Sequence, residues 1–158
     1  MRAWALLLMA LAGCGGEVVD IEIRFPSQET FLRSESARVF RFGVRPDQAD
    51  LCPALLQETA LGQPSTQPDW DSGLVPVCDL HAGLSVPVEG IGHEIFIVLT
   101  ENEADRVLLA GCTVSASVRS GTIVRLAPTP DYVDLYVRQP APDLSCKTPD
   151  EKCARGCD

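Results

Sequence analysis

The sequence of 158 residues is poor in histidine, in aromatic residues and in basic charge. Against 22 Asp and Glu there are 13 Lys and Arg, so the formal net charge is −9 at pH 7. An acidic chain repels the phosphate backbone of a nucleic acid. Aromatic residues make up 6% of the chain and do not interleave with basic ones along any stretch. We therefore expect no nucleic-acid partner.

Catalytic motifs are missing as well. Nucleophilic catalysis needs a base beside the nucleophile and a third group that orients the base. The two histidines, His81 and His93, lie in no recognisable motif, and the sequence contains neither G-x-S-x-G nor a Gly-rich phosphate loop. We expect His81 at a turn and His93 at the start of a strand, both with ordinary surface roles. The sequence therefore predicts no enzyme, no catalytic residue and no cofactor.

A membrane-spanning helix needs about 20 apolar residues, and no run in this sequence is that long. A shorter run, Ala3 to Leu11, follows Arg2 near the start of the chain and precedes the small residues Ala12 and Gly13. A positive residue, a short apolar segment and small residues in this order are typical of an export signal. We expect residues 1–13 to be removed on export.

The run Leu11-Ala12-Gly13-Cys14 resembles the signal of bacterial lipoproteins. The resemblance implies a diacylglycerol on the Cys14 thiol, cleavage before Cys14 and acylation of the new amino group. It also implies sorting to the outer membrane of a Gram-negative bacterium, because Gly15 rather than Asp follows the cysteine. An alternative remains: Ala10-Leu11-Ala12 fits the A-x-A pattern of ordinary signal cleavage, which would release a soluble protein beginning at Gly13.

The cysteine count agrees with lipidation of Cys14. An odd count of seven leaves one thiol unpaired in an oxidising compartment, whereas removing Cys14 leaves six candidates for disulfides: Cys52, Cys78, Cys112, Cys146, Cys153 and Cys157. Six cysteines allow fifteen pairings. We expect Cys52 to pair with Cys78, Cys112 to pair with one cysteine of the tail, and the other two tail cysteines to pair together.

A zinc site in the C-terminal tail is the alternative to disulfides, since thiolates bind zinc well. The tail has no C-x-x-C and no nearby histidine, so we expect disulfides and assign no metal ligand. Calcium stays open at two acidic segments. Asp69 to Gly73 has the D-x-D-x-G opening of a calcium loop but Leu80 where the twelfth residue should be Glu; Glu101 to Asp105 is expected to be a hairpin tip. Trp70 is expected to cover an edge of the core.

Apolar alternation predicts seven or eight short strands, with frequent Pro and Gly turns between them. We divide the chain into a signal (1–13), a lipidated N-terminus and tether (14–20), a domain (21–138) and a Pro- and Cys-rich tail (139–158). The pattern predicts an all-β fold, a single antiparallel β-sandwich, and loosely resembles immunoglobulin-like or prealbumin-like sandwiches. One short helical segment is expected at 48–61. The expected strands are 19–25, 38–45, 73–80, 84–88, 93–100, 107–118, 122–126 and 132–137. In 38–45 we expect Phe40, Phe42 and Val44 on one face and Arg41 and Arg45 opposite, in solvent, whereas 93–100 is apolar on both faces, as in a central strand.

Together these features predict a lipid-anchored protein of the cell envelope with a structural or partner-binding role. Its expected partners are the membrane, reached through the lipid on Cys14, and another envelope protein. An alternative is a module that binds carbohydrate or another small ligand through loops such as Gly62 to Gly73.

Overall fold

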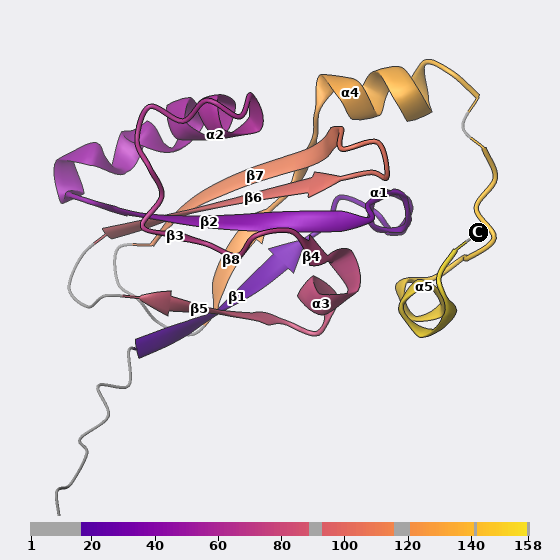
Figure 1. The fold of residues 1–158 in the computed structure, drawn as a ribbon, viewed down its shortest axis with the longest axis horizontal. Helices are drawn as coiled ribbons and strands as arrows, with labels where there is room; N and C mark the ends of the chain where they lie inside the picture. Colours follow the sequence, from indigo (N-terminus) through magenta and orange to yellow (C-terminus); the bar gives the residue numbers. More distant parts are fainter. Residues whose placement is uncertain (1–16, 89–92, 116–120, 141, 158) are drawn as a thin grey trace, which may run out of the picture.

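The computed structural model describes residues 17–88, 93–115, 121–140 and 142–157, and shows a mixed α/β fold with 31% helix and 38% strand in two sheets (Figure 1). The expectation of an all-β sandwich is therefore wrong. No helix among these residues is long and apolar enough to cross a membrane. The predicted division of the chain at residues 13, 20 and 138 stays a prediction.

The larger sheet has six antiparallel strands built around β6 (His93–Glu101). Strand β6 pairs with β2 (Ser36–Val44) on one side and with β7 (Val107–Ser115) on the other. Seven consecutive residues of β6 are buried, as the sequence predicts for a strand that is apolar on both faces. Three two-residue strands complete the sheet: β3 (Trp70–Asp71) and β4 (Val75–Pro76) beside β2, and β9 (Ala127–Pro128) beside β7.

The smaller sheet has the order β5-β1-β8. Its central strand, β1 (Glu17–Arg24), runs antiparallel to β5 (Leu84–Val88) and parallel to β8 (Thr122–Arg125). The alternation in the sequence of β1 is confirmed: Val19 and Ile21 are buried, whereas Asp20 and Glu22 are exposed. The parallel pair is a second departure from the expected fold, because a single antiparallel sandwich contains none.

The main core lies between the two sheets. It includes Val19 of β1, Val86 of β5 and Val124 of β8 from the smaller sheet, and Phe96 and Val98 of β6 from the larger one. The sheets approach closely at Gly111 of β7, where an added Cβ would lie 2.5 Å from the backbone oxygen of Arg125. Gly111 pairs in regular register with Val98, so this glycine provides room for β8 rather than marking a bulge.

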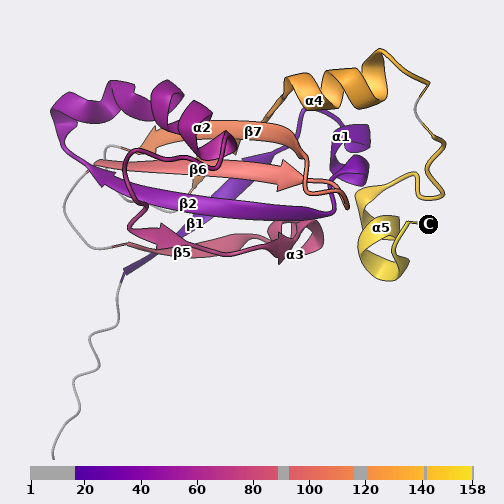
Figure 2. The same ribbon diagram turned by 45° about the horizontal axis from the view of Figure 1, so that its top comes forward.

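The opposite face of the larger sheet is covered by α2 (Cys52–Ala60), which follows the 3₁₀ helix η1 (Pro46–Leu51) (Figure 2). Leu55 of α2 packs with Phe40 and Phe42 of β2 and with Ile95 and Ile97 of β6. The helical segment expected at 48–61 is thus confirmed. The resulting order of layers is helix, six-stranded sheet and three-stranded sheet.

A further helix replaces the last expected strand. Residues 132–137 alternate in apolarity, but they belong to α4 (Pro130–Tyr132) and the π-helical turn η2 (Val133–Val137). The Thr129 side chain accepts a hydrogen bond from the backbone N–H of Tyr132, and Pro130 occupies the first helical turn. A side-chain cap followed by proline favours helix initiation. A short apolar run of six residues is compatible with either a strand or a helix. The capping signal at Thr129 and Pro130 therefore decides that these residues form a helix.

Three more helices gather at one end of the molecule: α1 (Gln28–Arg33), α3 (Val77–His81) and α5 (Pro149–Arg155) (Figures 1 and 2). Part of the segment expected as a strand at 73–80 is therefore helical. Strand β1 begins at the opposite end, so the start of the described chain and its C-terminal tail lie far apart. We call the end formed by α1, α3, α5 and the tail the helical cap.

Arg41 of β2 corrects another expectation. The alternation of β2 puts it opposite Phe40 and Phe42, on a face expected to meet solvent. The smaller sheet covers that face, and Arg41 is 3% exposed. Its Nη1 donates to the backbone oxygen of Pro87 in β5 over 2.7 Å, and its Nε lies 3.8 Å from Oε2 of Glu94. Arg41 therefore links the two sheets.

Candidate functional site

Six of the seven cysteines form three disulfides, and Cys14 lies outside the described residues. The pairs are Cys52–Cys112, Cys78–Cys153 and Cys146–Cys157. The expected bonds of Cys52 with Cys78 and of Cys112 with the tail are wrong, because α2 lies over the larger sheet and brings Cys52 to Cys112 in β7. The pairing of two tail cysteines with each other is confirmed. Three disulfides indicate an oxidising, extracytoplasmic environment.

Two of the disulfides involve the tail, and one of them fastens it to α3. Cys78–Cys153 joins α3 to α5, and Cys146–Cys157 closes the tail on itself across 11 residues. Cys146 is fully buried and packs with Phe31, Leu32 and Val77, the apolar cluster beneath the tail. The tail adds few apolar residues of its own, so covalent bonds and polar contacts hold it in place.

The principal polar contact is the ammonium of Lys152 in α5. It is 5% exposed and donates to the backbone oxygens of Leu32 and Ser34 over 2.9 and 2.8 Å and to Oε1 of Glu35 over 2.6 Å. An ammonium has three N–H donors, so these acceptors satisfy all of them. Burying a cation is costly unless it is paired and hydrogen-bonded. Lys152 therefore selects one position of α5 against the end of α1 and the two residues that link it to β2.

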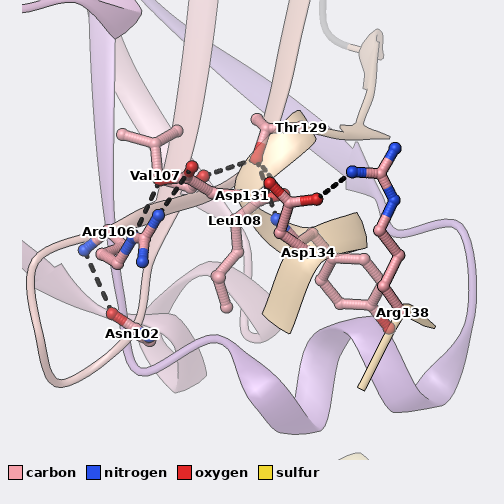
Figure 3. Close-up of polar contacts among 9 residues, drawn as sticks. Asn102, Arg106, Val107, Leu108, Thr129, Asp131, Asp134 and Arg138 are labelled. Carbon is pink, nitrogen blue, oxygen red and sulfur yellow. Dashed lines mark hydrogen bonds and ion pairs between the residues drawn. The ribbon is translucent and has the colours of Figure 1, made fainter. Parts of the chain in front are cut away.

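A second polar cluster fixes the turn between β6 and β7 to the start of α4 (Figure 3). The guanidinium of Arg106 donates two hydrogen bonds to the Asp131 carboxylate, from Nη2 over 2.9 Å and from Nε over 3.0 Å. This hydrogen-bonded ion pair lowers the pKa of Asp131 and raises that of Arg106. The Asn102 side chain accepts from the backbone N–H of Arg106 over 3.0 Å. The acidic segment from Glu101 to Asp105 thus forms the hairpin tip that the sequence predicts.

Thr129 completes this cluster at the start of α4. Its hydroxyl donates to the backbone oxygen of Val107 over 2.6 Å, as Figure 3 shows. The same hydroxyl accepts from the backbone N–H of Tyr132. The helix is thereby tied to the edge of β7. One turn further on, the ring of Tyr136 lies 5.3 Å from that of Tyr132 and beneath the guanidinium of Arg33. The attachment of α4 to β7 through Thr129 therefore determines where Tyr136 packs against the helical cap.

A cleft lies between α2, the following loop and β2. Its volume is about 430 Å³, and its lining includes Arg38, Phe40, Thr59, Gln67 and Asp71. Arg38 forks onto Asp71, with Nε at 2.9 Å from Oδ1, and its guanidinium carbon lies 5.1 Å from the centre of the Phe40 ring. The Arg38 hydrogen bond lowers the pKa of Asp71. The cleft thus presents a neutralised ion pair beside an aromatic ring.

The acidic loop next to this cleft uses its carboxylates internally. Asp69 accepts from the backbone N–H of Gly43, and Asp71 accepts from Arg38 and from the backbone N–H of Gly73. Trp70 is half-buried and packs against the core between the sheets, as expected. Trp70 therefore does not line the cleft. Within the described part of the chain, no three His, Cys, Asp or Glu residues gather as a metal site.

The two histidines belong to separate elements. His93 begins β6, as predicted, and His81 ends α3 at the turn that precedes β5. The His81 ring lies 5.2 Å from the Phe31 ring, and its Nε2 is 3.5 Å from Asp150 of α5. His81 thus adds a contact between α3 and the tail, in keeping with a role at the surface of the helical cap.

No protein-family model, curated protein or solved structure matches the chain. Its chemistry is therefore inferred from its own residues. Sequence reasoning missed Lys152, which sits in a charged segment without apolar periodicity. The capping motif Thr129-Pro130-Asp131 was a readable signal for α4.

We predict that Lys152→Met lowers the free energy of unfolding by about 2 kcal/mol or more, because three acceptors lose their common donor. Hydrogen exchange of residues 142–157 should accelerate with it. Denaturant unfolding and hydrogen exchange measured on the same variant test both effects. Lys147→Met, an exposed lysine of the same tail, is the matched control and should change stability by less than about 0.5 kcal/mol. Equal effects of the two substitutions would contradict the role of Lys152.

Proposed function

We propose that this chain is a lipid-anchored protein of the bacterial cell envelope whose disulfide-bonded domain has a structural or partner-binding role. The observation that carries the proposal is the pairing of the six cysteines after Cys14. It leaves Cys14 as the one thiol available for another fate, in the sequence context of a lipoprotein signal. Location in the outer membrane of a Gram-negative bacterium follows from Gly15 and belongs to the same proposal.

The position of β1 supports anchoring close to the membrane. Strand β1 begins at Glu17, so two residues, Gly15 and Gly16, separate it from Cys14, and the chain takes three residue steps between them. An extended chain advances by at most about 3.6 Å per residue, which places the start of the domain within about 11 Å of the lipidated residue. The helical cap lies at the opposite end of the domain. A protein held in this way presents the cap away from the membrane, where a partner can reach it.

The lipid itself accounts for the attachment. Each buried methylene contributes about 0.8 kcal/mol, and one acyl chain gives marginal binding, whereas two or three chains on one residue give stable anchoring. The acidic residues near the start of β1, Glu17 and Asp20, offer no electrostatic attraction to anionic lipid. Membrane attachment in this proposal therefore depends on Cys14 alone.

We predict that the protein expressed in a Gram-negative host partitions into detergent and carries the added mass of a lipidated N-terminal cysteine. Cys14→Ala should move it to the aqueous phase and abolish the added mass, because the thiol that receives the diacylglycerol is gone. Phase partitioning and intact-mass spectrometry are the measurements, and Gly15→Ala is the control that keeps the cysteine. A wild-type protein that stays in the aqueous phase and begins at Gly13 would establish the secreted alternative instead.

The cleft beside α2 favours a second candidate function, the binding of a small polar ligand such as a carbohydrate. Its volume falls in the range of roughly 300–1,000 Å³ found for small-molecule sites. Arg38, Asp71 and Gln67 offer donors and acceptors to ligand hydroxyls, beside Phe40 and two prolines. The half-buried Trp70 contributes no stacking surface, so recognition would rest on hydrogen bonds.

We predict that neutral mono- or disaccharides that occupy this cleft shift the backbone amide resonances of residues 59–71. Arg38→Met should weaken the response, because the guanidinium also holds Asp71 in place. Arg45→Met, which changes an exposed arginine directly after the same strand, is the control. Absence of any localised shift at millimolar saccharide would exclude this candidate.

A further inference from the structure

Arg33, the last residue of α1, is a buried cation with an incomplete set of partners. Its side chain is 7% exposed. A guanidinium has five N–H donors, yet among the described residues only Glu29 accepts a hydrogen bond from it, over 3.4 Å from Nη2. The Nε atom is buried without an acceptor. Glu29 is itself 56% exposed, so solvent weakens this one ion pair.

The face of the guanidinium is occupied by Tyr136. The guanidinium carbon lies 4.8 Å from the centre of the tyrosine ring. A cation–π contact of this kind holds the plane of the group but satisfies none of its N–H donors. The N–H donors lie at the edge of the guanidinium, where a carboxylate can accept two parallel hydrogen bonds. This edge is therefore the part of Arg33 that lacks hydrogen-bond acceptors.

Two cavities meet at this residue. One, of about 310 Å³, lies between α1 and the tail at Asp143 and Lys147, and the other, of about 290 Å³, lies between α1, Tyr136 and Pro142. Both are lined by Leu32, Arg33 and Leu144. Arg33 thus stands at the wall between two hollows whose volumes approach those of small-molecule sites. The leucines, Pro142 and Tyr136 give the second hollow apolar walls.

Arg33 is the only cation among the described residues that line the second hollow. Glu35 also lines it, but the ammonium of Lys152 lies 2.6 Å from its carboxylate and neutralises it. Glu103 lies at the exposed tip of the hairpin between β6 and β7. In the first hollow, the acids Glu29 and Asp143 are balanced by Arg33 and Lys147. A carboxylate that enters the second hollow therefore has Arg33 as the one cation of its described lining.

We propose that the seam between α1, Tyr136 and the tail binds a small organic carboxylate, whose oxygens engage the Arg33 guanidinium and whose apolar body lies against Leu32, Leu144 and Pro142. The ligand supplies hydrogen-bond acceptors that the protein itself does not provide to the buried Arg33 guanidinium. Burial gives the ion pair more strength than an exposed one, because solvent screens it less. The site belongs to the helical cap and is separate from the cleft beside α2.

Benzoate is a suitable probe because it combines a carboxylate with a compact apolar ring, and benzamide is its neutral counterpart. The lipid-free Cys14→Ala form of the mature chain is titrated with each, at constant ionic strength set with sodium chloride. We expect saturable binding of benzoate with amide shifts centred on residues 32–33, 136 and 144, and at least tenfold weaker binding of benzamide. This form lacks the Cys14 thiol and so carries no lipid there, whether or not the natural protein is lipidated, and the result is independent of the anchor.

Arg33→Gln should weaken benzoate binding at least tenfold, and Arg33→Lys should also weaken it, because lysine keeps the charge without the fork. Arg138→Gln, an exposed arginine on the same segment as Tyr136, should bind as the wild type does. Circular dichroism confirms that each variant is folded, and Arg33→Lys carries the test if Arg33→Gln is not. Absence of saturable binding, equal affinity for benzamide, or unchanged affinity in the Arg33 variants would overturn the proposal.

Discussion

A buried ammonium, that of Lys152, determines how the C-terminal tail meets the rest of the domain. Its three donors are matched by three acceptors at the end of α1 and in the link to β2, and the adjacent Cys153 is bonded to α3. A disulfide alone limits how far α5 can move, whereas the ammonium specifies which carbonyl groups α5 must face. Burial of the ion makes any other arrangement costly. The ion and the covalent bond act on neighbouring residues and so reinforce each other.

The helical cap depends on this arrangement. The tail places Cys146 over the apolar cluster of Phe31, Leu32 and Val77, and it places Leu144 beside Arg33 in both hollows. On the other side, the ion pair of Arg106 with Asp131 and the cap at Thr129 hold the helix that carries Tyr136. Arg33 lies where these two attachments converge. Polar and covalent contacts therefore order much of the cap, whereas the sheets and α2 are ordered mainly by apolar packing, with the Cys52–Cys112 bond joining α2 to β7.

Sequence patterns predicted the parts of the fold that apolar packing determines. The two apolar faces of β6, the face of β2 that carries Phe40 and Phe42, and the helix after Pro46 all follow from periodicity. The strand expected at 132–137 was wrong because a short apolar alternation does not separate the two periods, and the cap at Thr129 decides between them. Arg41 was expected in solvent because nothing local to β2 indicates that a second sheet covers it.

At the candidate sites, too, the sequence predicted what local patterns determine and missed what depends on tertiary packing. Cysteine parity indicated three bridges, but the partners depend on tertiary placement: α2 crosses the larger sheet, and the tail returns to α3. Lys152 and Arg33 carry no local signal, since a buried and an exposed cation look alike in a sequence. The role of Lys152 follows from the acceptors that surround its ammonium, and the role of Arg33 follows from the acceptors that are missing around its guanidinium.

Peptide mapping under non-reducing conditions tests most directly whether the tail is fastened to α3 as described. Alkylation of free thiols before digestion preserves the native pattern, and mass spectrometry then identifies each linked pair. The account predicts peptides that join Cys78 to Cys153, Cys146 to Cys157 and Cys52 to Cys112, with no alkylated thiol among these six. A bond between Cys52 and Cys78, or a free thiol at Cys153, would contradict it.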